Sequence, residues 1–146
     1  MPSIYSVLDK CPVPFGAHLV SGHVKKGNAA FDAKKSFFTD TSGTEIGADD
    51  AIKFLVKAKD TAAALAFQKR DEAKSITSVA KKIQAINTDQ GKIGYAVTWG
   101  EQVGKDGEDA CTWVCMVVTS NLTGGRHQWV TAHPATDDYV TRKKVA

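Results

Sequence analysis

The chain has 146 residues, a length that one domain accounts for, so residues 1–146 are interpreted as a single domain. Hydrophobic residues make up 42% of it and charged residues 24%, both close to the averages for globular proteins. No apolar run reaches the ~20 residues of a membrane-spanning helix, and we expect no membrane partner. The formal net charge of +3 is compatible with a polyanion such as RNA, but it equally suits an ordinary protein surface.

The three cysteines, Cys11, Cys111 and Cys115, form an odd set that does not read as a disulfide framework. No C-x-x-C metal pair is present. Cys111 and Cys115 are four residues apart in an expected strand, which predicts that both belong to the core. We therefore expect three reduced thiols and a reducing working compartment.

The first half of the chain predicts helices after a turn-rich start. Residues 1–22 are apolar and turn-rich, and two prolines and a glycine within residues 11–16 exclude a helix there. A short helix is expected over 29–35, an extended segment over 36–40 and an amphipathic helix over 48–59, with acidic residues in its first turn. Residues 61–88 are helical by composition, as one helix or two.

From residue 91 the apolar period changes to two, which indicates strands. Strands are expected over 93–99, 111–119 and 126–133, with a D-G turn within 104–109, and a fourth short strand over 139–141. The sequence therefore predicts an α+β fold in which N-terminal helices pack on a C-terminal antiparallel sheet.

The segment from Trp129 to Pro134 stands out within that sheet. A period of two places Trp129, Thr131 and His133 on one face of a strand that the proline would end. The four histidines, His18, His23, His127 and His133, lie near the two ends of the chain with none between. We expect those two ends to meet, with His127 left as a solvent-facing residue.

The residue types that accompany the histidines favour metal-free cleavage of RNA. Acidic clusters for two metal ions, a P-loop and a G-x-S-x-G elbow are all absent from the sequence. One imidazole could deprotonate a ribose 2′-OH, a second group could protonate the leaving 5′-oxygen, and a lysine could stabilise the charged phosphorane. The H-x4-H spacing of His18 and His23 would also suit a metal, but no third or fourth ligand follows in a compatible pattern.

The order of these segments resembles the ribonuclease A-like toxin domains of bacterial contact-dependent inhibition proteins and other polymorphic toxins. Those domains carry G-H-x4-H-V-G, a basic residue eleven positions later, S-S-F-x-D, a helix and a sheet ending in T-A-[YF]-P. This chain has His23-Val24, Lys34, the segment 36–40, the helix 48–59 and Thr131-Ala132-His133-Pro134, so the likeness covers residues 16–135. Lys25 replaces a glycine, Lys34 an arginine and His133 an aromatic residue.

The resemblance implies an RNase-toxin-like fold and a metal-independent endoribonuclease without cofactors. In that reading His23 is the general base, His133 the general acid, Lys34 or Lys35 the phosphorane stabiliser and Thr131 a positioning hydroxyl. His18 supports His23 or contacts substrate, and Trp129 stacks a base or belongs to the core. RNA toxins of the barnase, EndoU and colicin types remain an alternative family with nearly the same chemistry.

The resemblance also implies a biological setting. A monomeric toxin would be delivered from the producing bacterium and would act on RNA, with tRNA one candidate, in the cytoplasm of the target cell. A cognate immunity protein would block the site. The alternative is a non-catalytic α+β binding module, such as an immunity or phage accessory protein, in which His18, His23 and His133 are far apart or buried in satisfied hydrogen bonds.

Overall fold

The fold of the chain is α+β, with two antiparallel sheets. The computed structural model describes residues 21–27, 29, 31–69, 75–77, 82–122, 124–125 and 128–145, and the backbone alone at 59–69, 75–77 and 82. The helices are α2 (Ala48–Lys69) and α3 (Asp137–Lys143). The strands are β1 (Phe37–Phe38), β2 (Ser75–Thr77), β3 (Lys82–Ile86), β4 (Lys92–Thr98), β5 (Gly104–Asp106), β6 (Asp109–Cys111), β7 (Trp113–Thr119) and β8 (Trp129–Ala135).

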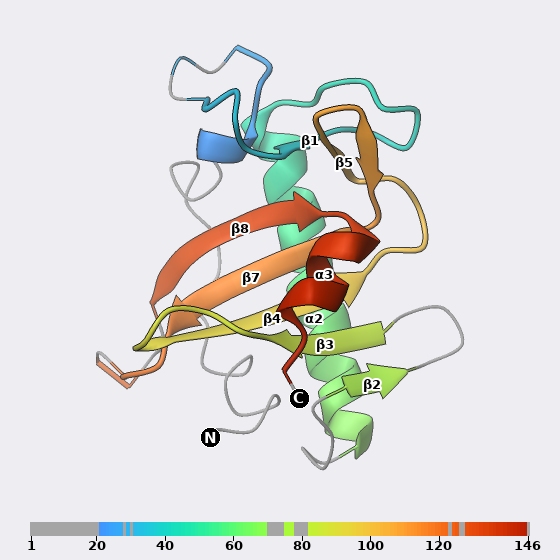
Figure 1. Ribbon diagram of the computed structural model, residues 1–146. Coiled ribbons are helices and arrows are strands. Elements are labelled where there is room, and N and C mark those ends of the chain that lie inside the picture. Colours follow the sequence, from blue (N-terminus) through green and yellow to red (C-terminus); the bar gives the residue numbers. More distant parts are fainter. Residues whose placement is uncertain are drawn as a thin grey trace.

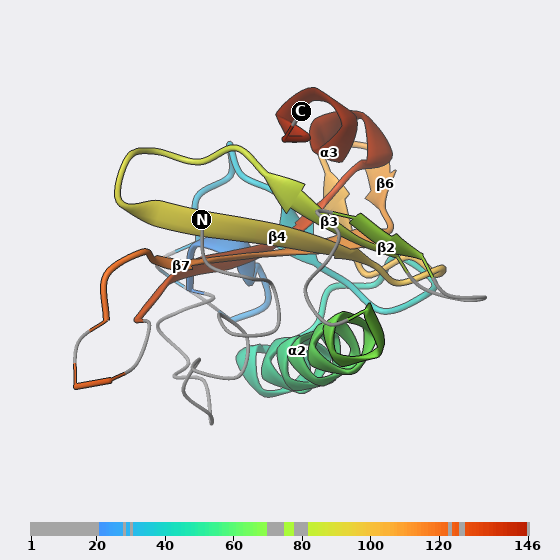
Figure 2. The ribbon, with the colours of Figure 1, turned by 90° about the horizontal axis from the view of Figure 1, so that it is seen from below.

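The larger sheet has five strands in the order β2-β3-β4-β7-β8, and the smaller has three in the order β1-β5-β6. Since β8 is the last strand of the larger sheet, its outer edge is open to other segments, and β1 and β5 of the smaller sheet contact it there. Helices α2 and α3 cover opposite faces of the five-stranded sheet (Figures 1 and 2). Neither helix of the described residues is both long and apolar enough to cross a membrane.

Each face of the sheet carries its own hydrophobic cluster. On the α2 face, Leu55 packs with alternate residues of the central strands such as Val97 and Met116, all of them buried. On the α3 face, Val140 packs with Trp113 and Cys115. Alternate residues of the strands therefore contribute apolar side chains to the two faces of the sheet. Helix α3 covers the face opposite the long helix α2.

Helix α2 confirms the expected helix over 48–59 and extends it through the alanine-rich segment to Lys69. Ala51, Leu55 and Ala58 are completely buried on its sheet-facing side, and Asp49 and Asp50 complement the helix dipole in the first turn. The helical expectation is wrong for the second part of 61–88, where β2 and β3 form. The isoleucines at i, i+3 spacing fit a helix stripe, but β-branched residues also suit a strand, and pairing with β4 decides the outcome.

Two shorter elements also differ from expectation. Residues 139–141 belong to α3, whose N-cap Thr136 accepts a hydrogen bond from the Tyr139 backbone N–H, so the expected fourth strand is wrong. Acidic residues in its first turn and basic residues in its last turn stabilise this helix through its dipole. The described part of 29–35 forms turns, with the Lys35 N–H bonded to the Asp32 carbonyl at 3.0 Å, in place of the expected helix.

The thiols of Cys111 and Cys115 are free and completely buried, as expected for core cysteines. They lie in different strands, β6 and β7, because the chain passes from the smaller sheet to the larger between them. Burial raises the pKa of the Cys111 thiol to about 12 and also raises that of Cys115, so both are poor nucleophiles. Cys11 lies outside the described residues.

A register shift in β8 decides which of its side chains face α3. Thr131 pairs with Val117 but Trp129 pairs with Val118, so Val130 is the extra residue of a β-bulge. The bulge turns Trp129 to the α2 face, where it packs against the core. The expectation that Trp129, Thr131 and His133 share one face is therefore wrong for Trp129.

Proline 134 does not end the strand, because β8 continues to Ala135. A proline lacks the N–H that a ladder needs, and sheets accept it on an edge strand. The Pro134 carbonyl accepts a hydrogen bond from the Ser36 hydroxyl at 2.7 Å, which shows that the backbone edge of this residue points away from β7. The outer edge of β8 is thereby fastened to the segment that precedes β1.

Candidate active site

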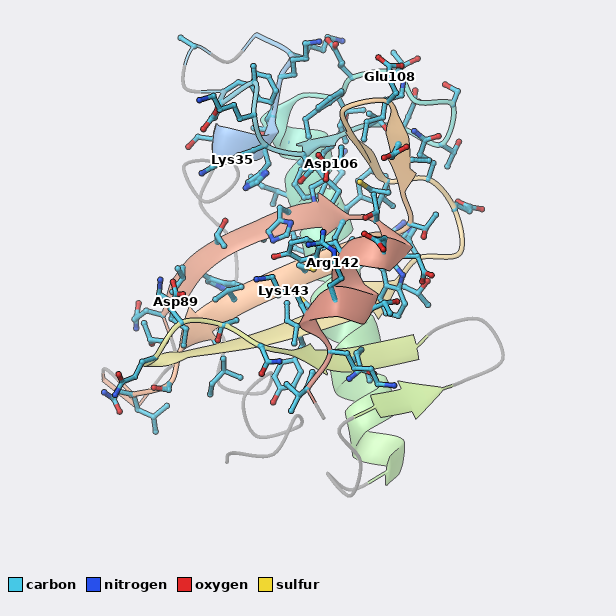
Figure 3. All side chains as sticks on the ribbon, in the orientation of Figure 1. Lys35, Asp89, Asp106, Glu108, Arg142 and Lys143 are labelled. Atoms are coloured by element: carbon cyan, nitrogen blue, oxygen red, sulfur yellow. The ribbon has the colours of Figure 1, made fainter. Side chains whose placement is uncertain are left out.

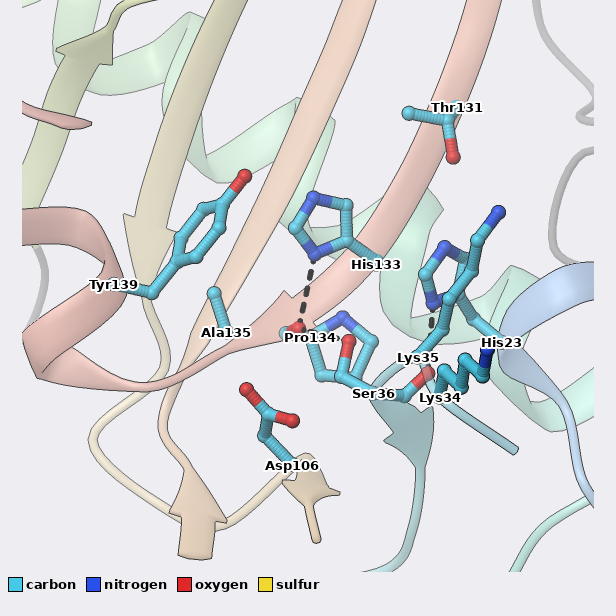
Figure 4. Close-up of a pocket in the computed structure, with 10 residues that line it drawn as sticks. All are labelled: His23, Lys34, Lys35, Ser36, Asp106, Thr131, His133, Pro134, Ala135 and Tyr139. Atoms are coloured by element: carbon cyan, nitrogen blue, oxygen red, sulfur yellow. Dashed lines mark hydrogen bonds between the residues drawn. The ribbon is translucent and has the colours of Figure 1, made fainter. Parts of the chain in front are cut away.

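A cavity of about 380 Å³ opens on the α3 face of the five-stranded sheet, between β8, α3 and the N-terminal segment (Figure 4). It brings together residues from both ends of the described chain, as expected from the positions of the histidines. Its lining residues are His23, Lys34, Lys35, Ser36, Asp106, Thr131, His133, Pro134, Ala135 and Tyr139.

The first imidazole belongs to His23, the last residue of a short 3₁₀ turn over 21–23. The ring is 8% exposed and is oriented by a hydrogen bond of 2.7 Å between Nδ1 and the Ser36 carbonyl oxygen. A carbonyl can only accept, so Nδ1 carries the hydrogen and Nε2 holds the lone pair. His23 is thus presented to the cavity as a neutral imidazole with a basic Nε2.

The second imidazole, His133, projects from β8 and is partly buried. Its Nδ1 lies 3.0 Å from the Pro134 carbonyl oxygen, the same atom that accepts from the Ser36 hydroxyl. This contact again fixes the hydrogen on Nδ1 and leaves Nε2 for proton exchange. Ser36 and Pro134 therefore connect the two imidazoles through three hydrogen bonds.

The two rings stack, with centroids 5.1 Å apart and planes inclined by 27°. On its other side His133 meets the ring of Tyr139 edge to face, with centroids 5.4 Å apart. The Tyr139 ring stands on α3 and points into the cavity beside His133 (Figure 4). Three rings thus form a row across the site, and His133 is the central one.

Both imidazoles have a depressed pKa. Burial and the neighbouring His133 ring lower the pKa of His23 to about 4, with a further contribution from the Lys35 ammonium. Burial also lowers the pKa of His133, again with a contribution from Lys35, while the Asp106 carboxylate opposes that shift. Burial raises the pKa of Tyr139, which keeps its hydroxyl protonated as a donor near neutral pH.

The two lysines that line the cavity are not equivalent. The charge of Lys35 acts on both histidines, and its Nζ lies beside the 3₁₀ turn, 3.7 Å from where a Cβ on Gly22 would be. Lys34 is exposed in the adjoining turn, where its backbone N–H donates to the Asp32 carboxylate at 2.9 Å. Lys25 is engaged elsewhere, in an ion pair with Glu45 at 3.0 Å. Lys35 is accordingly better placed than Lys34 to act at the site.

The structure thus brings together His23, His133, Thr131 and both lysines of the expected set. Trp129 is absent from the cavity because of the bulge at Val130. His18 and His127 lie outside the described residues, so their expected roles are not tested.

Three lining residues with polar side chains were not expected from the sequence: Ser36, Asp106 and Tyr139. Asp106 arrives on the β5–β6 hairpin, and its D-G turn signal predicts the hairpin but not where it points. Tyr139 could have been found, because Thr136 followed by two aspartates is an N-terminal helix signal. A helix starting there turns back over the sheet face that carries His133.

Comparisons with known proteins add no assignment to this geometry. A scan against protein-family models found no match, and searches of curated proteins and of solved structures found none either.

Proposed function

We propose that the chain is a metal-independent endoribonuclease that cleaves RNA through attack by the ribose 2′-OH. The observation that carries the proposal is the pairing of His23 and His133, whose rings stack at 5.1 Å within one cavity although they come from opposite ends of the chain. Two imidazoles with free Nε2 atoms, beside a lysine, supply a base, an acid and a cation in one place. A binding module with incidental histidines would account for the hydrogen bond at each Nδ1, but it gives no reason for this convergence in one cavity.

The proposed reaction uses each imidazole once. His23 Nε2 accepts the proton of the 2′-OH, and the 2′-oxygen attacks the adjacent phosphorus as the bond to the 5′-oxygen breaks. His133, protonated at Nε2, gives its proton to that leaving oxygen. The products are a 2′,3′-cyclic phosphate and a 5′-hydroxyl, and DNA is spared because it lacks the 2′-OH.

His133 must carry a proton to act as the acid, although its pKa lies below the usual value. A bound phosphodiester supplies one negative charge beside the Nε2 atoms of the two rings, and a nearby opposite charge raises the pKa of an imidazole. Substrate binding therefore favours the protonated state that the acid needs. In the free site the Lys35 ammonium disfavours protonation of both imidazoles. When the phosphate is bound, the same ammonium stabilises the negative charge of the phosphorane.

The other polar groups of the cavity have supporting roles in this proposal. Thr131 lies on β8 two residues before His133 and offers a hydroxyl to the substrate. The Tyr139 hydroxyl can donate to a phosphate oxygen near His133. Ser36 is a positioning residue, since it bonds to the carbonyl shared with His133 and itself accepts from His23.

The proposal extends to the fold family and the biological role. The order of the segments over residues 16–135 supports an RNase-toxin-like fold with helices packed on the sheet, used in competition between bacteria. A monomeric toxin delivered into a target cell would act on cytoplasmic RNA, with tRNA one candidate. A cognate immunity protein would have to cover the cavity that holds His23 and His133.

The test is degradation of RNA in the presence of EDTA by the wild type, His23→Ala and His133→Ala. We expect wild-type cleavage to persist in EDTA, with 2′,3′-cyclic phosphate ends detected by mass spectrometry. Each substitution should lower the rate by about 10²–10⁴-fold, as for loss of a general acid or base. Lys53→Ala, on the exposed side of α2, is the control and should cleave normally.

Two outcomes would contradict the proposal. Loss of wild-type cleavage in EDTA would overturn the metal-independent mechanism, and full activity in His23→Ala would overturn the assignment of the base. A wild type that is folded yet cleaves no RNA would favour the binding module instead.

A further inference from the structure

A second cavity of about 240 Å³ adjoins the first on the same face of the sheet. Thr131, His133 and Tyr139 line both cavities, so these residues form the boundary between them. His23 lines only the first cavity. Lys35 lies on one side of β8, and Lys143 lies on the other, over the sheet (Figure 3).

The polarity of the substrate follows from this arrangement. His23 takes the proton of the 2′-OH, so the nucleoside that carries this hydroxyl lies on the His23 side. His133 protonates the 5′-oxygen that leaves, so the departing nucleoside lies next to His133. Since the second cavity begins at His133 and does not include His23, a strand that lies across the Nε2 edges of the two stacked imidazoles enters it with its downstream nucleotide.

The polar groups of the second cavity suit a nucleotide. The lining of the second cavity has two lysines, Lys92 and Lys143, and one carboxylate, Asp89, which leaves an excess of one positive charge for a phosphate. Lys92 is occupied by that carboxylate at 3.4 Å, whereas the Lys143 ammonium lies 6.0 Å from the Tyr139 ring centroid, above the boundary of the two cavities. Lys143 is therefore the cation best placed for a phosphate.

Asn87 supplies the group that can contact a base. Its backbone N–H and its side-chain amide nitrogen donate to the carbonyls of Lys143 and Lys144, at 2.6 and 3.3 Å, which fixes the residue between β3 and the end of α3. An amide held through its nitrogen presents its oxygen as an acceptor. The same contacts hold the Lys143 backbone beside this acceptor, so both residues border the second cavity at the same place.

We propose that the second cavity binds the nucleotide on the 3′ side of the cleaved bond, with Lys143 at its 3′-phosphate and Asn87 at its base. This inference rests on the proposed ribonuclease function for the direction of the strand. The ligand class is a ribonucleotide within a chain, and the nucleotide released is the one that begins with the new 5′-hydroxyl.

Binding of uncleavable all-deoxy probes tests the inference without turnover. The probes are 2′-deoxynucleoside 3′-monophosphates, which fill the first cavity alone, and deoxydinucleotides with a terminal 3′-phosphate and each of the four downstream bases. We expect the wild type to bind the best dinucleotide about tenfold more tightly than the mononucleotide. Lys143→Gln combined with Asn87→Ala should remove most of that ratio and leave the mononucleotide Kd unchanged.

The control is Lys144→Gln, which removes the same charge one residue away, from a side chain that lines neither cavity. It should keep the wild-type ratio. Equal wild-type Kd values for the two probes, a ratio unaffected by the double substitution, or no binding of either probe would each overturn the inference.

Kinetics separate this inference from the proposed function. Hydrolysis of a 2′,3′-cyclic mononucleotide uses the two imidazoles but has no downstream nucleotide. Lys143→Gln should therefore lower kcat/KM for ribodinucleotide phosphates about fivefold or more, as for loss of a phosphate contact, and leave cyclic-nucleotide hydrolysis unchanged. A wild type that shows the expected Kd ratio but cleaves neither substrate would overturn the proposed function alone.

Discussion

The hydroxyl of Ser36 donates a hydrogen bond of 2.7 Å to the backbone carbonyl of Pro134, a residue 98 positions later in the chain. Each of the two residues also orients one histidine, because the Ser36 carbonyl accepts from His23 Nδ1 and the Pro134 carbonyl accepts from His133 Nδ1. One buried hydrogen bond between β8 and the residue that precedes β1 therefore connects the groups that orient the two imidazoles.

Replacing Ser36 by alanine tests this connection. We expect a loss of about 1 kcal/mol in the free energy of unfolding, the usual value for one buried hydrogen bond, measured by urea denaturation. We also expect kcat to fall about tenfold with KM little changed, since a small displacement of a reacting group affects turnover more than binding.

The matched control is Ser42→Ala, which removes an exposed hydroxyl bonded to the Asp40 carboxylate at 2.7 Å, outside the cavity. It should leave kcat unchanged. If Ser36→Ala lowers stability but turns over at the wild-type rate, Ser36 is a structural residue only.

The pH dependence of cleavage should reach its maximum in acid. His23 is a base only above its pKa, which burial lowers to about 4. His133 is an acid only below its own pKa, which burial shifts below the usual 6.5. The pH profile of kcat/KM, which reports the free enzyme, should therefore be a bell with its maximum below pH 6.5.

Substitution of Lys35 should move this profile. Its ammonium lowers the pKa of both imidazoles, so Lys35→Gln should shift both limbs of the bell to higher pH while it reduces the rate at the maximum. Lys34→Gln, with the same loss of charge from an exposed neighbour, should leave the limbs in place. If the two limbs of the pH profile lie at the same pH in Lys35→Gln as in the wild type, the ammonium of Lys35 does not lie beside the two rings.

The fold itself should lose stability on acidification because His23 is buried as a neutral imidazole. Its pKa is about 4 when folded and near 6.5 when unfolded, so the unfolded chain binds more protons between these values. The contribution of the neutral His23 imidazole to the free energy of unfolding is complete above pH 6.5. It is lost as the pH falls toward 4, by up to about 3 kcal/mol.

Urea denaturation at pH 7 and pH 4.5 measures this loss. His23→Gln, which cannot take up a proton, should show a smaller drop between the two pH values than the wild type. An equal drop in both proteins would assign the acid sensitivity to other groups.

The sequence predicts that the segments that carry His23 and His133 meet, because the histidines cluster near the two ends of the chain, and the described residues confirm this. It could not show the bulge at Val130, because a bulge is a property of the pairing between β7 and β8 and not of either strand alone. Because of the bulge, the Trp129 side chain lies on the α2 face of the sheet and not in the site. The side chains of Thr131 and His133 remain on the α3 face and line the cavity.

Other differences arise from local patterns that suit two structures. The isoleucines that precede residue 87 fit a helix by spacing and a strand by side-chain shape, and the β4 neighbour selects the strand. The segment around Tyr139 reads as a strand by side-chain type, but the cap at Thr136 and the flanking charges make it a helix. In both cases packing or capping outweighs the weak local preference.

Gly104 provides a test of how β8 is held against the smaller sheet. A Cβ at this position would lie 2.5 Å from the Phe37 carbonyl oxygen and would overlap the ring of Pro134. Both neighbours are rigid, since one is backbone and the other a proline ring, so Gly104→Ala must push β5 away from β8. We expect a loss of about 1–3 kcal/mol in the free energy of unfolding, as for an overpacked core.

The same substitution should reduce cleavage, because Pro134 carries the carbonyl that orients His133. Gly47→Ala is the control: open space surrounds its Cβ position, and the residue caps α2 with a carbonyl that accepts from the Ala51 N–H at 3.2 Å. It should cost less than about 1 kcal/mol, the usual range for a poorer N-cap, and leave kcat/KM unchanged. If urea denaturation finds the two variants equally stable, or if Gly104→Ala cleaves RNA at the wild-type rate, the close packing of β5 on Pro134 does not position His133.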